Sequence, residues 1–198
     1  MVTFGGIVPE HQASTAYLLS TFDLVGAGDV DVVNQAVERS DRVEARVFSD
    51  EAISEVIGKP PVMPFEERLD IAGSMRGVDD AALFDPVKQL KRGPRDIVFA
   101  RGQISENIPD VDHLLLPRAM QLQDWASAPE VTDGVLGYVP GAWDHFHIGH
   151  LNILRRAREM CDRLVVGVVT DEELLAAKGK RPMVPLDERV SVVASMEI

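Results

Sequence analysis

Residues 135–150 read VLGYVPGAWDHFHIGH, an apolar run followed by a glycine-containing turn and the first residues of a helix. Apolar residues at helical spacing continue the helix beyond the turn, namely Ile148, Leu151, Ile153, Leu154 and Ala157. His147 and His150 are three positions apart, so they share one face of this helix. A helix N-terminus also presents free N–H groups and a partial positive charge. The segment therefore predicts a strand–turn–helix unit that binds an anion such as phosphate.

The chain contains an internal repeat. Residues 21–75 align without a gap on residues 142–196, at an offset of 121 residues (142 minus 21). The best-matched pairs of segments are 47–51 with 168–172, 58–61 with 179–182, 64–68 with 185–189, and 74–75 with 195–196. Solenoid repeats are much shorter, about 20–45 residues. We therefore expect each copy to be a domain.

Each copy is predicted to form a strand–helix–strand–helix unit. The first strand is expected at residues 17–19 in one copy and 135–139 in the other. The run 164–169 is apolar on both faces, as in a buried parallel strand, and is followed by an expected polar loop containing Gly179 and Pro182 and by a helix over 188–196. The first copy continues with three more expected strands, at 81–84, 96–100 and 113–116. This order predicts the α/β class with parallel, doubly wound sheets.

The predicted organisation is two tandem Rossmann-like domains, over residues 13–120 and 134–198, joined by a polar linker over 121–133. By the offset, the counterpart of Leu116 would be residue 237 (116 plus 121). The second domain is therefore expected to be C-terminally incomplete. Two explanations stay open: the chain is a fragment, or the domain is completed in another way.

Composition narrows the range of partners. The chain has 198 residues, 45% of them hydrophobic, and a formal net charge of −12. This acidic balance argues against broad binding to nucleic acids or anionic membranes, but not against one small anion in a local basic site. The N-terminal residues lack the basic and apolar regions of a secretory signal, and no apolar run approaches the roughly 20 residues that span a bilayer. A cytoplasmic protein without a membrane span is expected.

The residues around the two histidines suggest chemistry on phosphate groups. The turn 141–144 follows the first strand of its copy, and the cations of the segment 178–181 follow the second. Open α/β sheets bind ligands at the edge where strands end. Transfer of a phosphoryl group depends mainly on positioning and on cationic or hydrogen-bonding groups that stabilise the developing charge. We therefore interpret this edge as a site that binds phosphate groups and stabilises charge on a phosphoryl group.

With these residues on the page, the second copy resembles the cytidylyltransferase family of nucleotidyltransferases. The family pattern Gly-x-Phe-Asp-x-x-His-x-Gly-His is matched by residues 141–150, with Trp143 in place of Phe. The family's later motifs correspond to residues 170–172, 178–180 and 188–189. The tandem arrangement is similar to that of the ethanolamine-phosphate cytidylyltransferases, and the second copy alone also resembles the glycerol-3-phosphate cytidylyltransferases.

The resemblance implies that a substrate phosphate oxygen attacks the α-phosphorus of a nucleoside triphosphate and that pyrophosphate leaves. CTP and a small phosphorylated alcohol, phosphoethanolamine or glycerol 3-phosphate, are the expected substrates, with Mg²⁺ bound to the triphosphate and no metal bound by the protein alone. A homodimer is a further expectation from the family. The implied catalytic residues are His147, His150 and Lys178. The implied nucleotide-binding residues are Gly141, Ala142, Trp143, Asp144, Gly149, Lys180 and Arg189.

Two of these roles have alternatives. Asp144 is expected to support the turn and the histidine geometry in preference to abstracting a proton. Arg189 either reaches the nucleotide or braces its helix by ion pairing, and the sequence does not separate the two.

The first copy lacks the site motif. Gly26, Gly28 and Asp29 stand at the positions of the two histidines and the glycine between them, and Ile57 stands at the position of Lys178. An aspartate at a phosphate position repels the ligand. We therefore predict a catalytically inactive first domain with a packing or regulatory role.

Other functions remain as alternatives. The His-Ile-Gly-His motif also marks class I aminoacyl-tRNA synthetases, but their Lys-Met-Ser-Lys-Ser loop is absent from this sequence. A sugar-phosphate adenylyltransferase that uses ATP fits the motifs better. A nucleotide-binding pseudoenzyme without turnover is the alternative outside the enzyme class.

Overall fold

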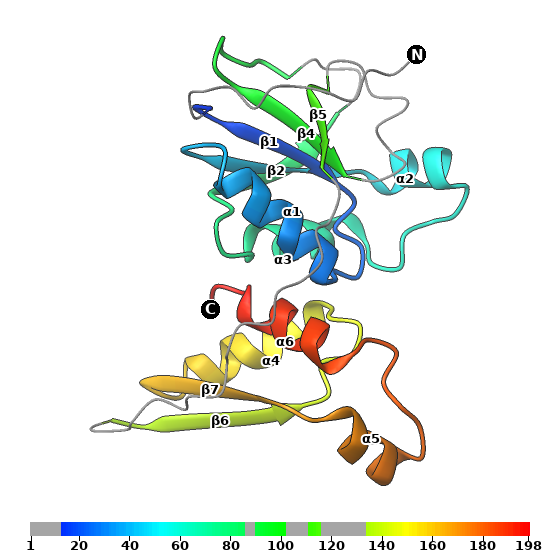
Figure 1. Cartoon of the computed structure of the whole chain (residues 1–198), viewed down its shortest axis with the longest axis vertical. Coiled ribbons are helices and arrows are strands. Elements are labelled where there is room, and N and C mark those ends of the chain that lie inside the picture. Colours follow the sequence, from blue (N-terminus) through cyan, green and yellow to red (C-terminus); the bar gives the residue numbers. More distant parts are fainter. Residues whose placement is uncertain (1–12, 86–89, 102–110, 116–133) are drawn as a thin grey trace.

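The computed structural model describes residues 13–85, 90–101, 111–115 and 134–198. These residues form two sheets with layers of helices between them (Figure 1). The first sheet has the strand order β3-β2-β1-β4-β5, formed by β1 Ala16–Ser20, β2 Val43–Phe48, β3 Asp80–Phe84, β4 Ile97–Arg101 and β5 His113–Leu115. The second sheet pairs β6 Leu136–Gly141 with β7 Arg163–Val168. All strand pairs in both sheets are parallel, which confirms the α/β class.

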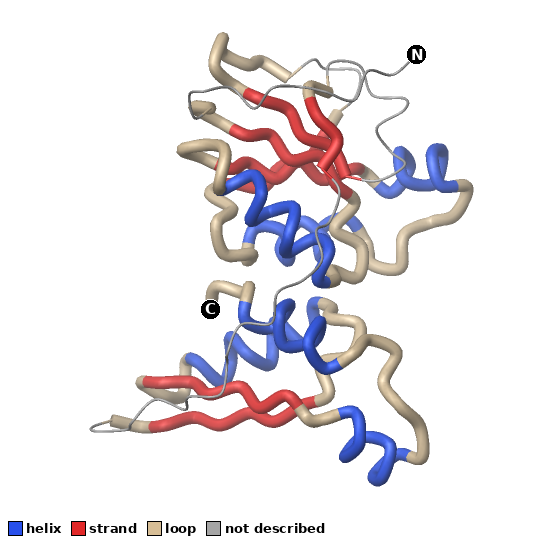
Figure 2. Tube along the Cα trace, viewed as in Figure 1, coloured by secondary structure: helices blue, strands red, loops and turns tan. Residues whose placement is uncertain are grey.

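The six helices of the described residues are α1 Ala27–Val37, α2 Asp50–Ile57, α3 Phe65–Gly73, α4 Ile148–Arg158, α5 Asp171–Lys178 and α6 Leu186–Ala194. Helices α1, α3, α4 and α6 lie between the two sheets (Figure 2). The expected strands are confirmed, with bounds that shift by one or two residues. The expected linker over 121–133 lies outside the described residues. Among the described residues, no helix combines the length and the apolar character that crossing a membrane requires.

Strand β1 shows why the first sheet forms. All five of its residues are buried, as expected for a central parallel strand with both faces covered. Leu18 belongs to the apolar cluster on the helical side, whereas Tyr17 and Leu19 belong to a second cluster on the opposite face. Alternate side chains of the strand thus enter two different cores.

Helix α5 differs from the sequence-based expectation, which has a polar loop directly after the strand. Thr170 and Glu173 form a capping box that starts this helix: the Thr170 hydroxyl accepts a hydrogen bond from the Glu173 N–H at 3.2 Å, and the Glu173 carboxylate accepts one from the Thr170 N–H at 3.1 Å. Gly179 ends the helix at a φ of +70°, a conformation that glycine adopts readily. Lys178 is therefore the last residue of a helix, and the loop begins after it.

The sequence repeat is preserved in the structure. Helices α1, α2 and α3 coincide with α4, α5 and α6 when 121 is added to their residue numbers. Even the unusual backbone recurs, because Phe22 and Leu24 have φ of +51° and +52°, and the corresponding Trp143 and His145 have φ of +55° and +49°. Such conformations cost energy in residues other than glycine. Both copies therefore build the same strained turn between strand and helix.

The two halves pack through a pseudo-symmetric contact. Helix α1 faces α6, and α3 faces α4, which is the same pair of surfaces used twice. Met75 and Met196, which correspond by the offset, form an antiparallel bridge at the centre. The N–H of Arg76 donates to Ser195 O, and the N–H of Glu197 donates to Ser74 O, at 2.6 and 2.7 Å. One buried apolar cluster contains side chains of both halves, among them Trp143 and Phe146 of the turn before α4.

Arg155 breaks this symmetry and provides a test of the contact. Its guanidinium donates to both carboxylate oxygens of Asp70 at 2.8 Å and to the Ser74 hydroxyl at 2.7 Å. By the offset, Asn34 corresponds to Arg155 and Ser191 corresponds to Asp70. The Arg155 and Asp70 side chains are 38% and 43% exposed, so we expect Arg155→Ala to lower the free energy of unfolding by about 0.5–1 kcal/mol.

Urea denaturation measures this loss, and a charge swap provides the control. Asp70→Arg should destabilise the chain more than the double variant Asp70→Arg/Arg155→Asp, because only the single variant places two cations together. The hydrogen bond from Arg155 lowers the pKa of Asp70. The stabilisation is therefore complete above the unfolded-state pKa of Asp70 and is lost as the pH falls through the folded-state value. Equal losses in the single and double variants would contradict this pairing.

Candidate functional site

The candidate site lies where β6 ends and α4 begins, at the carboxyl edge of the second sheet (Figure 1). His147 immediately precedes α4, and its Nδ1 accepts a hydrogen bond from the Gly149 N–H at 3.0 Å. The Nδ1 of His150 accepts one from the His147 N–H at 3.4 Å. The two imidazole rings stack with their centroids 4.0 Å apart. The structure thus brings together the two histidines that the sequence pairs.

These hydrogen bonds determine which ring nitrogen can donate. In a neutral imidazole one nitrogen accepts and the other carries the proton. Because Nδ1 of both His147 and His150 accepts a backbone N–H, the proton of each neutral ring is on Nε2. Two Nε2–H donors beside a helix N-terminus suit a ligand that carries several anionic oxygens.

Burial affects the charge of His150. Loss of hydration on burial, followed by the proximity of His147, lowers the pKa of His150 to about 4, although Asp144 acts in the opposite direction. His150 is therefore neutral at pH 7 in the free chain. A neutral imidazole donates a hydrogen bond to phosphate without the cost of burying a charge.

We expect the His150 ring to titrate with a midpoint near pH 4 in an NMR titration. Because the folded-state pKa is below the ordinary value of 6.5, the unfolded chain binds more protons between these two pH values. The contribution of His150 to stability is therefore complete above pH 6.5 and is lost as the pH falls towards 4. His150→Asn should remove this part of the pH dependence, measured as the difference between the two denaturation series. A midpoint near 6.5 would contradict the burial argument.

Two glycines of the motif are required by the aromatic rings. A Cβ on Gly141 would lie 2.6 Å from the indole of Trp143, and a Cβ on Gly149 would lie 2.8 Å from the ring of His147. Trp143 is buried, donates its Nε1–H to Gly167 O at 2.8 Å, and meets the His150 ring edge-on with centroids 5.4 Å apart. Gly141 thus leaves room for the indole that contacts His150, and Gly149 leaves room for the ring of His147.

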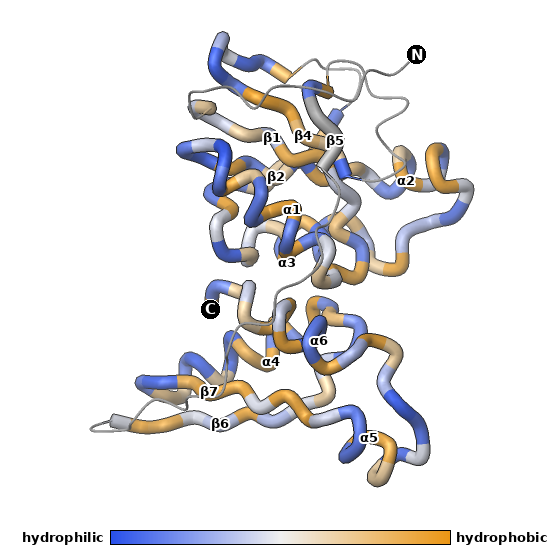
Figure 3. The backbone as a smooth tube through the Cα atoms, in the orientation of Figure 1, coloured by the Kyte–Doolittle hydropathy of each residue, from blue (hydrophilic) through white to orange (hydrophobic). Residues whose placement is uncertain are grey.

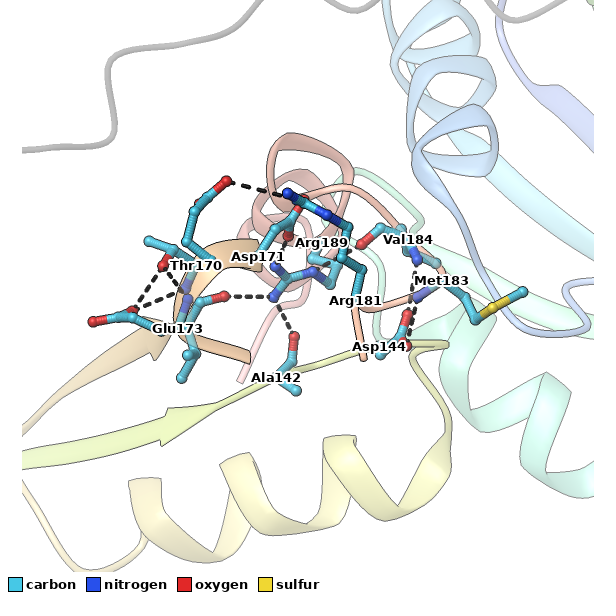
Figure 4. Close-up of polar contacts among 11 residues, drawn as sticks. Ala142, Asp144, Thr170, Asp171, Glu173, Arg181, Met183, Val184 and Arg189 are labelled. Atoms are coloured by element: carbon cyan, nitrogen blue, oxygen red, sulfur yellow. Dashed lines mark hydrogen bonds and ion pairs between the residues drawn. The ribbon is translucent and has the colours of Figure 1, made fainter. Parts of the chain in front are cut away.

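Asp144 ties the turn to the loop that precedes α6 (Figure 4). Its two carboxylate oxygens accept hydrogen bonds from the N–H groups of Met183 and Val184, both at 2.9 Å. Burial alone would raise the pKa of Asp144, but these two hydrogen bonds, with the nearby charges of His145 and Arg189, lower it. This geometry supports the structural role that the sequence favours for Asp144.

Arg189 is a fully buried hub that joins four segments (Figure 4). Its Nε donates to Val184 O at 2.9 Å and its Nη2 to the Asp171 carboxylate at 2.5 Å. Nη1 donates to Ala142 O at 2.5 Å and to Val169 O at 2.9 Å. Of the two alternatives for Arg189, this geometry favours the brace. Direct contact of Arg189 with a nucleotide stays a prediction.

The cations of the neighbouring loop are less constrained. Lys178 and Lys180 are exposed, and within the described residues neither makes a hydrogen bond or ion pair with the two histidines. Arg181 pairs at 3.6 Å with Glu172, and both side chains are largely exposed. The loop that follows is fixed at its far end by Asp144. The structure therefore places both lysines on the carboxyl side of β7, free to turn towards a ligand.

A comparison of the two halves distinguishes the contacts that belong to the fold from those found only at the candidate site. Arg68 repeats the contacts of Arg189, with bonds to Met63 O, Thr21 O and Asp50 at 3.0, 2.7 and 2.5 Å. Asp23 likewise accepts the N–H groups of residues 62 and 63. Features shared by both halves thus belong to the architecture. The stacked histidines, the lysine at the end of α5 and the indole are replaced at the equivalent positions of the first half by Gly26, Asp29, Ile57 and Phe22.

In the first half, the position of the second histidine holds an internal anion. Asp29 is buried, accepts the N–H of Gly26 at 2.9 Å and forms an ion pair with Arg101 of β4. Its carboxylate therefore occupies the N-terminus of α1, where an anionic ligand would otherwise bind.

Sequence reasoning matched Asp171 to a family motif without giving it a role, and it missed the carbonyl of Gly167. Asp171 pairs with Arg189, and Gly167 O accepts the proton of the Trp143 indole. The repeat carried a signal for the first of these, because Asp50 and Arg68 recur as Asp171 and Arg189 even though the first copy lost its histidines. Nothing in the sequence indicates the carbonyl.

The donor groups near the histidines do not form a metal site of their own. Within the described residues, no group of three or more His, Cys, Asp or Glu side chains could hold a metal ion. Both oxygens of Asp144 already accept backbone N–H groups. A magnesium ion would depend on the phosphate oxygens of a bound triphosphate for most of its ligands.

Comparison with known proteins agrees with the site geometry. Residues 138–197 match the family model described as Cytidylyltransferase-like. The second half carries a cytidylyltransferase-like domain. The match covers both histidines, Lys178 and Arg189.

Individual relatives match the same region. Ethanolamine-phosphate cytidylyltransferase of Arabidopsis thaliana is 50% identical over 60 residues, which are 30% of this chain and 14% of the relative. The protein of the same name in Dictyostelium discoideum is 52% identical over 56 residues, 28% of this chain and 15% of the relative. Bifunctional protein HldE of Acidiphilium cryptum is 42% identical over 62 residues, 31% of this chain and 13% of the relative. The chain thus matches only a small part of the length of these relatives.

Proposed function

We propose that the second half transfers CMP from CTP to a small phosphorylated alcohol, phosphoethanolamine or glycerol 3-phosphate, and releases pyrophosphate. The observation that carries this proposal is the stacked pair His147 and His150 at the N-terminus of α4, with Nδ1 of both rings engaged by the backbone. The similarity to proteins named ethanolamine-phosphate cytidylyltransferase supports the choice of CTP and phosphoethanolamine.

In the proposed reaction, a phosphate oxygen of the acceptor attacks the α-phosphorus of CTP. A new P–O bond forms, the bond between the α-phosphorus and the bridging oxygen breaks, and that oxygen leaves with pyrophosphate. No covalent enzyme intermediate is required. The Nε2–H groups of the two histidines and the N–H groups at the start of α4 donate to phosphate oxygens on which charge develops. These hydrogen bonds stabilise the transition state more than the bound substrates, and this difference lowers the barrier.

Lys178 and Lys180 neutralise phosphate charge in this proposal. Both are exposed at the edge where β7 ends, and a bound triphosphate would draw their ammonium groups inward. Asp144 and Arg189 act as positioning residues, because they fix the turn and the loop that flank the ligand. Gly141, Ala142, Trp143 and Gly149 contribute the shape of the turn.

The first half serves as a packing partner in this proposal. Its site position is closed by Asp29 and Arg101, and its helices α1 and α3 support α6 and α4. The chain would thus consist of two tandem nucleotidyltransferase-like domains, one of which has lost the chemistry. We also propose a cytoplasmic location and a homodimer, on the family resemblance alone.

The test is pyrophosphate release by the full 198-residue chain. CTP and ATP are each supplied, with Mg²⁺, together with phosphoethanolamine, glycerol 3-phosphate or a sugar 1-phosphate. Release that needs CTP and one of the two phospho-alcohols is the expected result. Release with ATP and the sugar phosphate would favour the adenylyltransferase alternative.

Calorimetric titration with CTP separates the remaining case. Binding without pyrophosphate release under any combination would identify a nucleotide-binding pseudoenzyme. Absence of both binding and release would contradict the proposed function.

A further inference from the structure

Three aromatic rings lie against the imidazole of His150. The ring of His147 stacks on it with centroids 4.0 Å apart, and the rings of Trp143 and Phe146 have their centroids 5.4 and 5.5 Å from its own. Trp143 and Phe146 are only 4% and 2% exposed. Buried apolar rings keep water away from the imidazole, and loss of hydration disfavours its charged form. We call these three rings the aromatic enclosure of His150.

The indole of Trp143 is fixed by a hydrogen bond to the neighbouring strand. Its Nε1–H donates to Gly167 O at 2.8 Å. A Cβ on Gly141 would lie 2.6 Å from the indole, so the ring covers the last residue of β6 and reaches β7. Hydrophobic stretches along β7 are visible in Figure 3. The wall of the enclosure that Trp143 forms cannot move without breaking this hydrogen bond.

Protonation of His150 would disturb the start of α4. Its Nδ1 accepts the His147 N–H at 3.4 Å. Both nitrogens of an imidazolium carry protons, so a charged ring cannot accept this hydrogen bond. Two titratable groups of the described residues act on the charge of His150: His147 disfavours it, and Asp144 favours it. The geometry of the turn therefore depends on a neutral His150.

The first half lacks most of the enclosure. Of the three ring positions, only one holds a ring there, Phe22, which has nearly the same φ as Trp143 (+51° and +55°) but no N–H to donate. Gly26 and Val25 stand at the other two positions, and the carboxylate of Asp29 stands in place of the histidine. Phe22 and Val25 are buried, so the fold accepts these residues in the same turn. The indole N–H and the second apolar ring thus accompany the histidine and are not needed to build the turn.

We propose that Trp143 is a positioning residue: through its hydrogen bond to Gly167 O it holds the aromatic enclosure in place, keeps His150 neutral and so keeps the site active at mildly acidic pH. Phe146 is the second apolar wall of the enclosure. This role differs from direct contact of Trp143 with the nucleotide, which the family resemblance implies. The consequence for activity rests on the proposed function, whereas the consequence for the charge of His150 does not.

Two variants of the full 198-residue chain copy the residues of the first half into the second, Trp143→Phe and Phe146→Val. Both should fold, because the equivalent Phe22 and Val25 are buried in the same turn, and circular dichroism verifies this. The His150 ring is titrated by NMR, and its signal is identified by its loss in His150→Asn. We expect a midpoint near pH 4 in the unaltered chain and a midpoint about one pH unit higher in each variant, which is a tenfold rise in proton affinity.

The matched control is Phe22→Leu. It removes a buried ring from the equivalent position and lowers stability, but it leaves the enclosure intact. The midpoint of His150 should therefore remain near pH 4. An unchanged midpoint in Trp143→Phe, or an equal rise in Phe22→Leu, would overturn the proposal.

The pH dependence of pyrophosphate release connects the enclosure to the reaction. The acid limb of kcat/KM reports the protonation of groups in the free enzyme. In Trp143→Phe this limb should move to higher pH together with the His150 midpoint, while turnover at neutral pH stays largely unchanged. A limb that stays in place while the midpoint rises would overturn the positioning role, and so would a higher KM for CTP without a shift of the limb. Absence of turnover in the unaltered chain would contradict the proposed function alone, because the titration still decides whether Trp143 controls the charge of His150.

Discussion

In the proposed reaction, replacing His147 with alanine is expected to reduce the turnover of nucleotidyl transfer about 100- to 1,000-fold. The substitution removes an Nε2–H donor from the point where charge develops on the phosphate oxygens. It also removes the ring that stacks 4.0 Å from His150. Pyrophosphate release under saturating CTP and acceptor measures the loss.

A second variant separates catalysis from folding, because His147 also caps helix α4 through the Gly149 N–H. Loss of an N-cap costs about 1 kcal/mol. His147→Asn retains a side-chain acceptor of the type that helix N-termini prefer, but it lacks the imidazole. We expect this variant to be nearly as stable as the unaltered chain and still inactive. Substantial activity in His147→Asn would show that the cap, and not the imidazole, is what the reaction needs.

The matched control lies in the first half. Gly26 stands at the position of His147, and a Cβ added there would meet nothing within 4 Å. Gly26→Ala therefore fits without strain, costs at most about 1 kcal/mol as a change of helix cap, and should leave turnover largely unchanged. Comparable losses from His147→Ala and Gly26→Ala would contradict the assignment of the chemistry to the second half.

Much of the architecture could be predicted because local pattern and fold agree. Strands β1 and β7 contain continuous apolar runs, and the repeat places the same elements twice. Only β1 is buried throughout, because every residue of β7 is half-buried, in contrast to the buried strand that its sequence predicts. Helix α5 escaped prediction because its sequence, DEELLAAK, is only eight residues long and half of these are polar. Its formation depends on the Thr170–Glu173 capping box and on Gly179, which act through backbone geometry and not through apolar periodicity.

The contact between the halves could not be predicted from local pattern. Arg155 is one of three arginines in the last turn of α4, and nothing nearby in the sequence shows that Asp70, 85 residues away, is its partner. The same holds at the candidate site. The histidine pair follows from spacing on a helix, whereas the Trp143 bond to Gly167 O depends on how β7 lies beside β6.

Replacing Arg189 with alanine is expected to cause the largest loss of stability, about 3–5 kcal/mol. The side chain is fully buried and donates to three carbonyl oxygens and to Asp171. Its removal leaves these acceptors and a carboxylate without a partner, and it opens a cavity between the turn and α6. Urea denaturation followed by circular dichroism measures the change in the free energy of unfolding.

Two comparisons show whether burial causes the effect. Arg181 also forms an ion pair, with Glu172, but the two side chains are 60% and 76% exposed, so Arg181→Ala should change stability by less than about 1 kcal/mol. Arg68 repeats the network of Arg189 in a half without histidines. Arg68→Ala should therefore destabilise the chain about as much as Arg189→Ala.

Arg189→Lys separates the two roles that the sequence left open. A lysine keeps the positive charge but cannot direct donors to Val184, Ala142, Val169 and Asp171 together. If Arg189 is a brace, the lysine variant loses stability, and turnover falls because the turn before His147 is no longer fixed. If Arg189 contacts the nucleotide, the variant keeps its stability and its KM for CTP rises. The buried network, duplicated around Arg68 in a half that has lost the histidines, leads us to expect the first result.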